Sequence, residues 1–202
     1  MPIIARHCSC TIVGGMPTVI SHALVPAGAA PFLRSFSRRA LLAASFCAML
    51  PDVDVVGMPF GIAYGSRFGH RGFTHSIAFA CLVAAIVTPL VAPRGTRAKS
   101  ALLLAAATLS HGLLDMLTNG GRGVALFSPW VDTRLFFPWR PIAVSPIGVA
   151  FFSARGLHVL ASELLWIGGP AAALFASGVL RNRLRVRGAP AAAPPTDSHG
   201  TR

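Results

Sequence analysis

Five apolar runs separated by short polar stretches are the feature that most constrains how this chain can fold. The runs cover residues 19–33, 40–50 with an extension toward 58, 76–92, 101–117 and 157–180. A helix needs about 20 predominantly apolar residues to cross a bilayer, a length that the fifth run reaches most clearly and the first two runs do not. The sequence therefore predicts an all-α fold, a polytopic transmembrane helical bundle of about four to five spans. The two short runs could be tilted or re-entrant.

The charge of the chain supports a membrane location. Only 12% of the residues are charged, which is about half the fraction in an ordinary soluble domain. Basic residues outnumber acidic ones by 18 to 6, and they gather in clusters at 34–39, 94–99 and 181–187. Five crossings place these clusters on one side, which the positive-inside rule makes cytoplasmic. Nucleic-acid binding, another reason for a net charge of +12, is disfavoured because the Arg residues form tight clusters between apolar runs.

The two ends of the chain differ from its middle in composition. Residues 1–15 are expected to be a disordered N-terminal extension, because Met16 offers a natural start and no signal peptide is evident. Residues 188–202 form an Ala/Pro-rich polar tail that is also expected to be disordered. This leaves residues 16–187 as one membrane-embedded domain. The four cysteines show no spacing typical of a zinc site.

Polar residues suited to metal binding occur in four motifs beside the apolar runs. The motifs are SH at 21–22, LPDVD at 50–54, FGHRGFTHS at 68–76 and SHGLLD at 110–115. With five crossings all four lie at the same end of the bundle, opposite the basic clusters. They contain seven candidate ligands: His22, Asp52, Asp54, His70, His75, His111 and Asp115.

Each motif also has an ordinary structural explanation. The carboxylates of LPDVD could lie in a solvated loop, and the two imidazoles of FGHRGFTHS could lie in a polar turn capped by a hydroxyl. His111 and Asp115 are four residues apart and therefore share a helix face. A membrane helix rarely keeps such a pair without a function, and the shared end of the bundle strengthens the metal interpretation.

The chemistry of these seven side chains indicates a metal-dependent hydrolase. Imidazole and carboxylate without thiolate suit a divalent Zn, Mn or Fe ion, and seven ligands exceed one tetrahedral site, so one or two ions are expected. Such centres activate water and stabilise the oxygens of a phosphoester displacement. Two further residues are predicted to be catalytic. Arg71 would hold an anionic oxygen, and Glu163 in the fifth run would act as general base, although it could also be a ligand or a salt-bridge partner.

The ordered motifs SHA (21–23), LPDVD (50–54), GHRGFTHS (69–76) and SHGLLDMLT (110–118) resemble the YdjM-like family. Its members are bacterial inner-membrane proteins described as membrane-bound metal-dependent hydrolases. The resemblance implies a multi-pass helical protein of the bacterial inner (cytoplasmic) membrane. It also implies that the seven His and Asp residues of these motifs bind metal.

The leading hypothesis is a membrane-bound metal-dependent hydrolase that acts on a lipid-linked or membrane-proximal (phospho)ester through a metal-activated water. Its expected partners are membrane lipids or a lipid-linked substrate, and no nucleic acid. One alternative is an ion-coupled membrane transporter, because intramembrane His and Asp residues also build ion pathways, although no internal repeat is evident. The other is a metal-stapled membrane scaffold. Burying seven such side chains without any cation would be costly.

Overall fold

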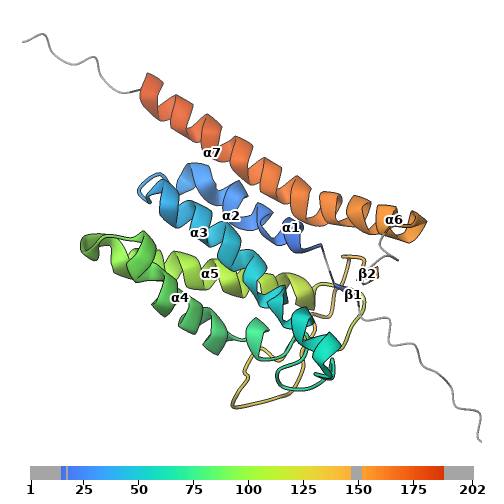
Figure 1. Ribbon diagram of the computed structural model, residues 1–202. Helices are drawn as coiled ribbons and strands as arrows, with labels where there is room; N and C mark the ends of the chain where they lie inside the picture. Colours follow the sequence, from blue (N-terminus) through green and yellow to red (C-terminus); the bar gives the residue numbers. More distant parts are fainter. Residues whose placement is uncertain (1–14, 17, 147–151, 189–202) are drawn as a thin grey trace, which may run out of the picture.

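All five apolar runs are helical in the computed structural model, which describes residues 15–16, 18–146 and 152–188. Most of the predicted extension and tail, residues 1–14 and 189–202, lies outside the described residues. The α-helices are α1 (Val19–His22), α2 (Leu24–Ala29), α3 (Arg38–Met49), α4 (Ile77–Val91), α5 (Arg97–Met116), α6 (Ala154–Glu163) and α7 (Gly169–Arg187). The predicted all-α class is confirmed (Figure 1).

Shorter helical turns extend or connect these helices. They are the 3-10 helices η1 (Ala30–Phe32), η2 (Leu50–Phe60), η3 (Phe73–His75) and η4 (Arg94–Thr96), and the π-helix η6 (Leu164–Gly168) between α6 and α7. Two short strands, β1 (Gly15–Met16) and β2 (Ser145–Pro146), pair antiparallel, with Gly15 opposite Pro146 and Met16 opposite Ser145. Pro51 lies in the first turn of η2 and lacks an N–H group, so the α-helical hydrogen-bonding pattern of α3 changes there.

The helices pack through small side chains and expose large apolar ones. The core between α3, α4 and α5 is built mainly from alanines such as Ala44, Ala84 and Ala107. In contrast, Phe46 and Leu90 are 70% and 75% exposed. A soluble bundle buries its large apolar side chains, whereas membrane helices use small residues to approach one another and turn large ones to the lipid. The packing therefore supports a membrane bundle.

Two continuous helical segments are long and apolar enough to cross a membrane, namely Arg38–Phe60 and Ala154–Arg187. In their most apolar windows only 33% and 22% of the residues are buried. The core helix of a soluble protein, in contrast, is mostly buried. The apolar helices Val19–Phe32 and Ile77–Val91 are shorter than a full span. The number of crossings therefore stays a prediction.

The basic clusters gather at one end of the bundle, as predicted. Lys99 Nζ donates to the Ser35 carbonyl oxygen at 3.2 Å, and the Arg181 guanidinium lies over the Phe32 ring at 5.5 Å. These contacts bring the second cluster against the first, and the third cluster against the residues directly before the first. Figure 1 shows the turn between α4 and α5, the turn before α3 and the end of α7 at the same end, away from the loops that follow η2 and α5.

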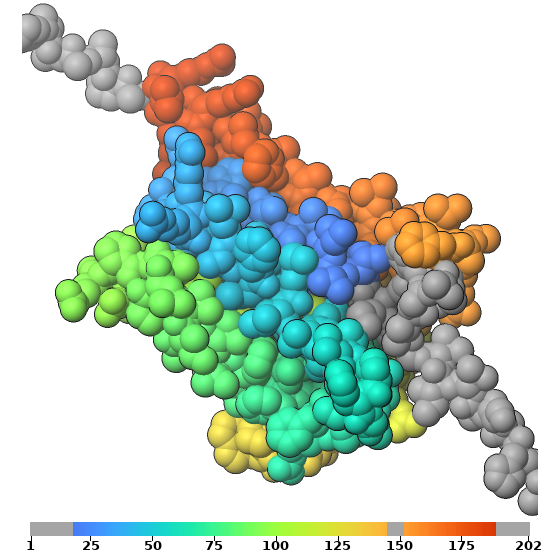
Figure 2. Space-filling model, in the orientation of Figure 1, coloured from blue at the N-terminus to red at the C-terminus, as the bar shows by residue number. Residues whose placement is uncertain are grey.

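The last helical segment lies along the first one, as the blue and orange-red surfaces of Figure 2 show. A glycine at position 28 permits this close approach, because a Cβ atom there would lie 2.7 Å from the Ala171 carbonyl oxygen. Near the basic end, the Asn182 side chain donates to the Pro31 carbonyl oxygen at 2.8 Å. The contact between α2 and α7 is therefore between backbones, with little room for adjustment.

Replacing Gly28 by alanine tests this packing. The added methyl group meets backbone atoms of α7, so we expect the substitution Gly28→Ala to lower the free energy of unfolding by about 1–3 kcal/mol. Thermal unfolding in detergent measures the effect. The matched control is Gly169→Ala, where the new Cβ would lie at an ordinary contact distance of 3.7 Å from the Leu164 carbonyl oxygen. An equal loss of stability in both variants would contradict the close approach.

Candidate metal centre

Four residues from three separate segments converge in the interior of the bundle. Asp52 comes from η2, His75 from η3, and His111 and Asp115 from the last turns of α5. Each side chain offers one oxygen or nitrogen atom, and these four atoms all lie within 4.8 Å of one another. All four residues are at most 3% exposed. The predicted convergence of LPDVD, FGHRGFTHS and SHGLLD is therefore observed.

The distances between these four atoms match those around a metal ion. His111 Nε2 lies 3.2 Å from Asp52 Oδ1, and His75 Nε2 lies 3.2 Å from Asp115 Oδ2. The cross distances are 3.6 Å from His75 Nε2 to Asp52 Oδ1 and 3.9 Å from His111 Nε2 to Asp115 Oδ2. Ligands about 2.0–2.2 Å from a tetrahedral ion are separated by about 3.3–3.6 Å. The four residues therefore fit a single small divalent ion.

The same four atoms are buried without a hydrogen-bond partner among the described residues. A buried polar atom without a partner costs free energy, and native structures rarely leave several together. Two carboxylate oxygens that face two imidazole nitrogens form a donor set typical of Zn, Mn or Fe. A cation at their centre would satisfy all four at once.

The opposite sides of the two imidazole rings are held in place. His111 Nδ1 donates to the Ala48 carbonyl oxygen at 2.7 Å; because a carbonyl only accepts, the proton is on Nδ1 and Nε2 is free as a ligand. His75 Nδ1 lies 3.3 Å from Asp54 Oδ2, which leaves its Nε2 facing the cluster. Such hydrogen bonds to the second ring nitrogen orient histidine ligands in metalloproteins.

Asp54 is placed behind the first group of ligands. Its Oδ1 lies 2.8 Å from His70 Nδ1, and its Oδ2 accepts hydrogen bonds from Thr74 Oγ1 at 2.6 Å and from the Arg71 backbone N–H at 3.2 Å. Asp54, His70 and His75 form a second group that could hold an ion. Because the oxygens of Asp54 already accept hydrogen bonds, the first group is the better fit for a metal ion.

Arg71, which is predicted to hold an anionic oxygen of a substrate, contacts protein groups instead. Its guanidinium is fully buried, with Nε 3.0 Å from Asp115 Oδ2 and with Nη2 donating to Asp115 Oδ1 at 3.1 Å. Its Nη1 donates to Thr118 Oγ1 and to the Gly120 carbonyl oxygen, both at 3.0 Å. The guanidinium therefore orients a candidate ligand, and a contact with substrate stays a prediction.

The backbone of Arg71 adopts a left-handed conformation with a φ of 62°. This conformation is uncommon for a residue with a side chain and costs free energy, so the surrounding structure must maintain it. The Arg71 carbonyl oxygen accepts from the Ala125 N–H at 3.0 Å and from Arg134 Nη1 at 3.3 Å. The strained backbone places the Arg71 side chain against Asp115 while its N–H reaches Asp54.

A close backbone contact sets the distance between His75 and His111. A Cβ atom at Gly112 would lie 2.8 Å from the His75 carbonyl oxygen. The glycine next to His111 therefore lets η3 lie directly against α5, which brings the two rings to 4.8 Å between centroids in an edge-to-face arrangement. The glycine of the SHGLLD motif thus has a positional function.

His22 stacks on the cluster without joining either group of ligands. Its ring lies 3.6 Å from the His111 ring and is tilted by only 12°. The side chain is fully buried, and neither ring nitrogen has a hydrogen-bond partner among the described residues. The structure therefore brings His22 to the predicted end of the bundle, whereas metal binding by His22 stays a prediction.

Glu163, predicted as a general base, lies at the end of α6 beside the start of α1. Its carboxylate accepts from the Thr18 backbone N–H at 2.6 Å and from the Thr18 hydroxyl. The side chain is 3% exposed and belongs to neither group of possible ligands. Through these contacts Glu163 connects the last helical segment to the start of the first. Its catalytic role stays a prediction.

Electrostatics also favour a cation at the cluster. Burial alone would lower the pKa of His75, but the neighbouring carboxylates of Asp115, Asp52 and Asp54 outweigh burial and raise that pKa well above its usual value. These three carboxylates share one buried guanidinium, that of Arg71. The cluster is therefore short of positive charge, which either a proton on His75 or a metal ion would supply.

Sequence reasoning missed several residues that support the cluster. Thr74 bonds Asp54, and Thr118 bonds Arg71. Arg134 donates to the carbonyl oxygens of Ser66 and His70, which ties the loop after η2 to the loop after α5. The two threonines lie next to or within three residues of candidate ligands, so proximity could have indicated them. Arg134 lies in a segment whose polar residues form no recognisable motif, so nothing in the sequence indicated its contacts.

Comparison with known proteins gives two findings. The family model described as YdjM inner membrane protein matches residues 16–184. The inner membrane protein YbcI of Escherichia coli (strain K12) is 44% identical over 158 residues, which cover 75% of this chain and 91% of that protein. No solved structure matches significantly.

The burial of the Arg71–Asp115 ion pair predicts a large cost for removing the guanidinium. We expect the substitution Arg71→Met to lower the free energy of unfolding by about 3–5 kcal/mol, because it leaves Asp115 as an uncompensated buried charge. Chemical denaturation in detergent measures the loss. The control is Arg67→Met, which removes the ion pair between Arg67 and Asp132. Both of these side chains are about half exposed, so we expect little change in the free energy of unfolding.

Proposed function

This chain belongs to the YdjM inner membrane protein family, and from that membership and its buried His/Asp cluster we propose that it is a membrane-bound metal-dependent hydrolase. One observation carries the proposal. Four ligand atoms from three separate segments lie at metal-ligand spacing and have no hydrogen-bond partner among the described residues. Asp52, His75, His111 and Asp115 would hold the ion.

The ion and the chain have separate tasks in this proposal. When bound, a divalent ion supplies a Lewis acid and lowers the pKa of a coordinated water. The chain supplies orientation: Asp54 fixes the ring of His75, the Ala48 carbonyl oxygen fixes the ring of His111, and Arg71 fixes the carboxylate of Asp115. Burial of the cluster excludes bulk water and strengthens these electrostatic contacts.

The number of protein ligands favours particular metals. Four ligands complete the shell of a tetrahedral zinc ion and leave no position for a substrate, which is typical of structural zinc sites. An ion that prefers six ligands, such as Mn or Fe, would keep two positions for water and substrate. Hydrolysis therefore needs an ion with an open position, which would be Mn or Fe, or Zn held by three of the four side chains. The closed, buried geometry also supports the second candidate function, a metal-stapled membrane scaffold.

The substrate class follows from the location of the site. We propose that five helical segments cross the inner membrane, with the basic clusters on the cytoplasmic side, as the positive-inside rule predicts, and with the metal centre near the opposite face. A substrate that reaches this position is itself in or at the membrane. A lipid-linked or membrane-proximal phosphoester suits both the location and the chemistry of a carboxylate-bound divalent ion.

Metal content is the first test of the proposal. Elemental mass spectrometry of the detergent-purified protein should find about one equivalent of a transition metal, because the four-atom group holds one ion. The variant His75→Ala/Asp115→Ala should lose it, and so should the isosteric variant Asp52→Asn, which removes a ligand charge with little change in shape. The exposed His158 provides the control His158→Ala, which should retain the metal. Retention of metal in the cluster variants would contradict the proposed site.

Activity separates the hydrolase from the scaffold. In mixed micelles we expect the metal-loaded protein to hydrolyse a p-nitrophenyl phosphodiester that carries an acyl chain. Asp52→Asn should reduce the rate by at least about 100-fold, because it disrupts the group that supplies the Lewis acid. Chelation should abolish hydrolysis before helix content, measured by circular dichroism, is lost. A protein that binds metal, hydrolyses no phosphoester and unfolds on chelation would instead be a metal-stapled scaffold.

A further inference from the structure

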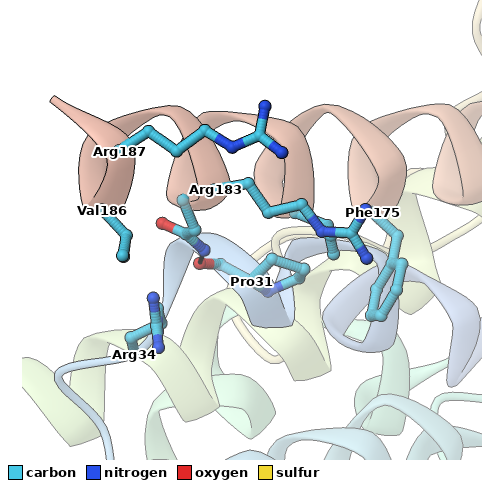
Figure 3. A pocket seen from close by; sticks show the side chains of 8 residues that line it. Pro31, Arg34, Phe175, Arg183, Val186 and Arg187 are labelled. Carbon is cyan, nitrogen blue, oxygen red and sulfur yellow. Dashed lines mark hydrogen bonds between the residues drawn. The ribbon is translucent and has the colours of Figure 1, made fainter.

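A second site-like feature lies at the basic end of the bundle, remote from the candidate metal centre. It is a groove of about 720 Å³ between η1 and the second half of α7. Figure 3 shows the groove with the α7 side chains along one wall and Pro31 and Arg34 along the other. We call it the basic groove.

The basic groove has an apolar part formed mainly by α7. Phe175 and Val179 are four residues apart and share a face of the helix, opposite Pro31. Phe175 remains 48% exposed despite this position. An apolar wall of this kind, on a helix that is long and apolar enough to cross a membrane, suits a hydrocarbon chain.

Three arginines supply the charge of the basic groove. Arg183 and Arg187 lie on successive turns of α7, and Arg34 approaches from the turn after η1 (Figure 3). None of the ion pairs between described residues includes any of these three arginines. The groove therefore presents a concentration of positive charge without a described carboxylate to neutralise it.

The polarity of the groove changes along its length. From Phe175 to Arg183 the helix advances about 12 Å, at about 1.5 Å per residue. Over this distance the lining changes from Phe175 and Val179 toward the middle of the bundle to the three arginines at the basic end, where Val186 also lies. A phospholipid has the same order of polarity when its phosphate lies at the membrane surface and its chains point inward.

We propose that the basic groove binds an anionic phospholipid of the membrane. Arg34, Arg183 and Arg187 hold the phosphate, because guanidinium groups form bidentate, charge-assisted hydrogen bonds with phosphate oxygens. Phe175 and Val179 contact an acyl chain. Basic pockets between helices on the cytoplasmic side are suited to anionic headgroups, and a free phosphate ion would leave the apolar wall without a ligand.

This lipid is separate from any substrate of the metal centre. The basic groove joins the first and last helical segments, which meet closely through Gly28 and through the hydrogen bond of Asn182 to Pro31. A lipid bound across both walls therefore stabilises the contact between α2 and α7. Binding should raise the thermal unfolding temperature of the protein, because a ligand that binds only the folded state stabilises that state.

Native mass spectrometry of the full chain in a neutral detergent tests the proposal. Phosphatidylglycerol and phosphatidylcholine with identical acyl chains are titrated in parallel. We expect one phosphatidylglycerol to bind at least about tenfold more tightly than phosphatidylcholine, because the three arginines favour the anionic headgroup. The variant Arg34→Gln/Arg183→Gln/Arg187→Gln should reduce this preference to within about twofold, and phosphatidylglycerol should no longer raise its unfolding temperature.

A charge-matched control separates the groove from the general basic surface. The variant Arg38→Gln/Arg39→Gln/Arg94→Gln removes three exposed arginines from the same end and should keep the lipid preference. Equal loss of preference in the two variants would overturn the proposal, and so would equal binding of the two lipids by the unmodified protein. Displacement of phosphatidylglycerol by millimolar inorganic phosphate would also overturn it, because the occupant would then be a free anion.

Discussion

The buried ion pair between Arg71 and Asp115 is the contact on which the rest of the site depends. The Arg71 side chain holds Asp115, while its backbone N–H holds Asp54. One residue in a left-handed conformation therefore fixes two of the three carboxylates, from two different segments. Because Asp54 in turn faces the ring of His75, displacement of Arg71 would disturb both a carboxylate and an imidazole of the candidate metal centre.

The packing of the bundle makes this arrangement possible. Asp and His side chains are short, so their polar atoms meet only when the backbones that carry them are close together. The alanine-rich core of α3, α4 and α5 and the glycine at position 112 bring these backbones into contact. Large apolar side chains face outward, where lipid can solvate them. The same choice of small interior residues therefore serves both the membrane environment and the site.

Much of this organisation could be predicted from the sequence. Hydropathy indicates the helices, and five predicted crossings, an odd number, are enough to expect four motifs at one end and three basic clusters at the other. The roles of individual residues could not be predicted in this way. Asp52 and Asp54 differ by two positions, yet one faces the cluster and the other accepts from Thr74 behind it. Tertiary contacts of η2 decide between them, just as they direct Arg71 toward Asp115.

The distribution of the cluster along the chain has a consequence for biogenesis. Its members are spread from η2 to the end of α5, so the site is incomplete until α5 has packed against the earlier segments. Until then Asp52 and His75 face each other without His111 and Asp115, the two members of the cluster that α5 supplies. The complete set of four ligands is therefore available to an ion only after α5 has been translated and has packed against the earlier segments.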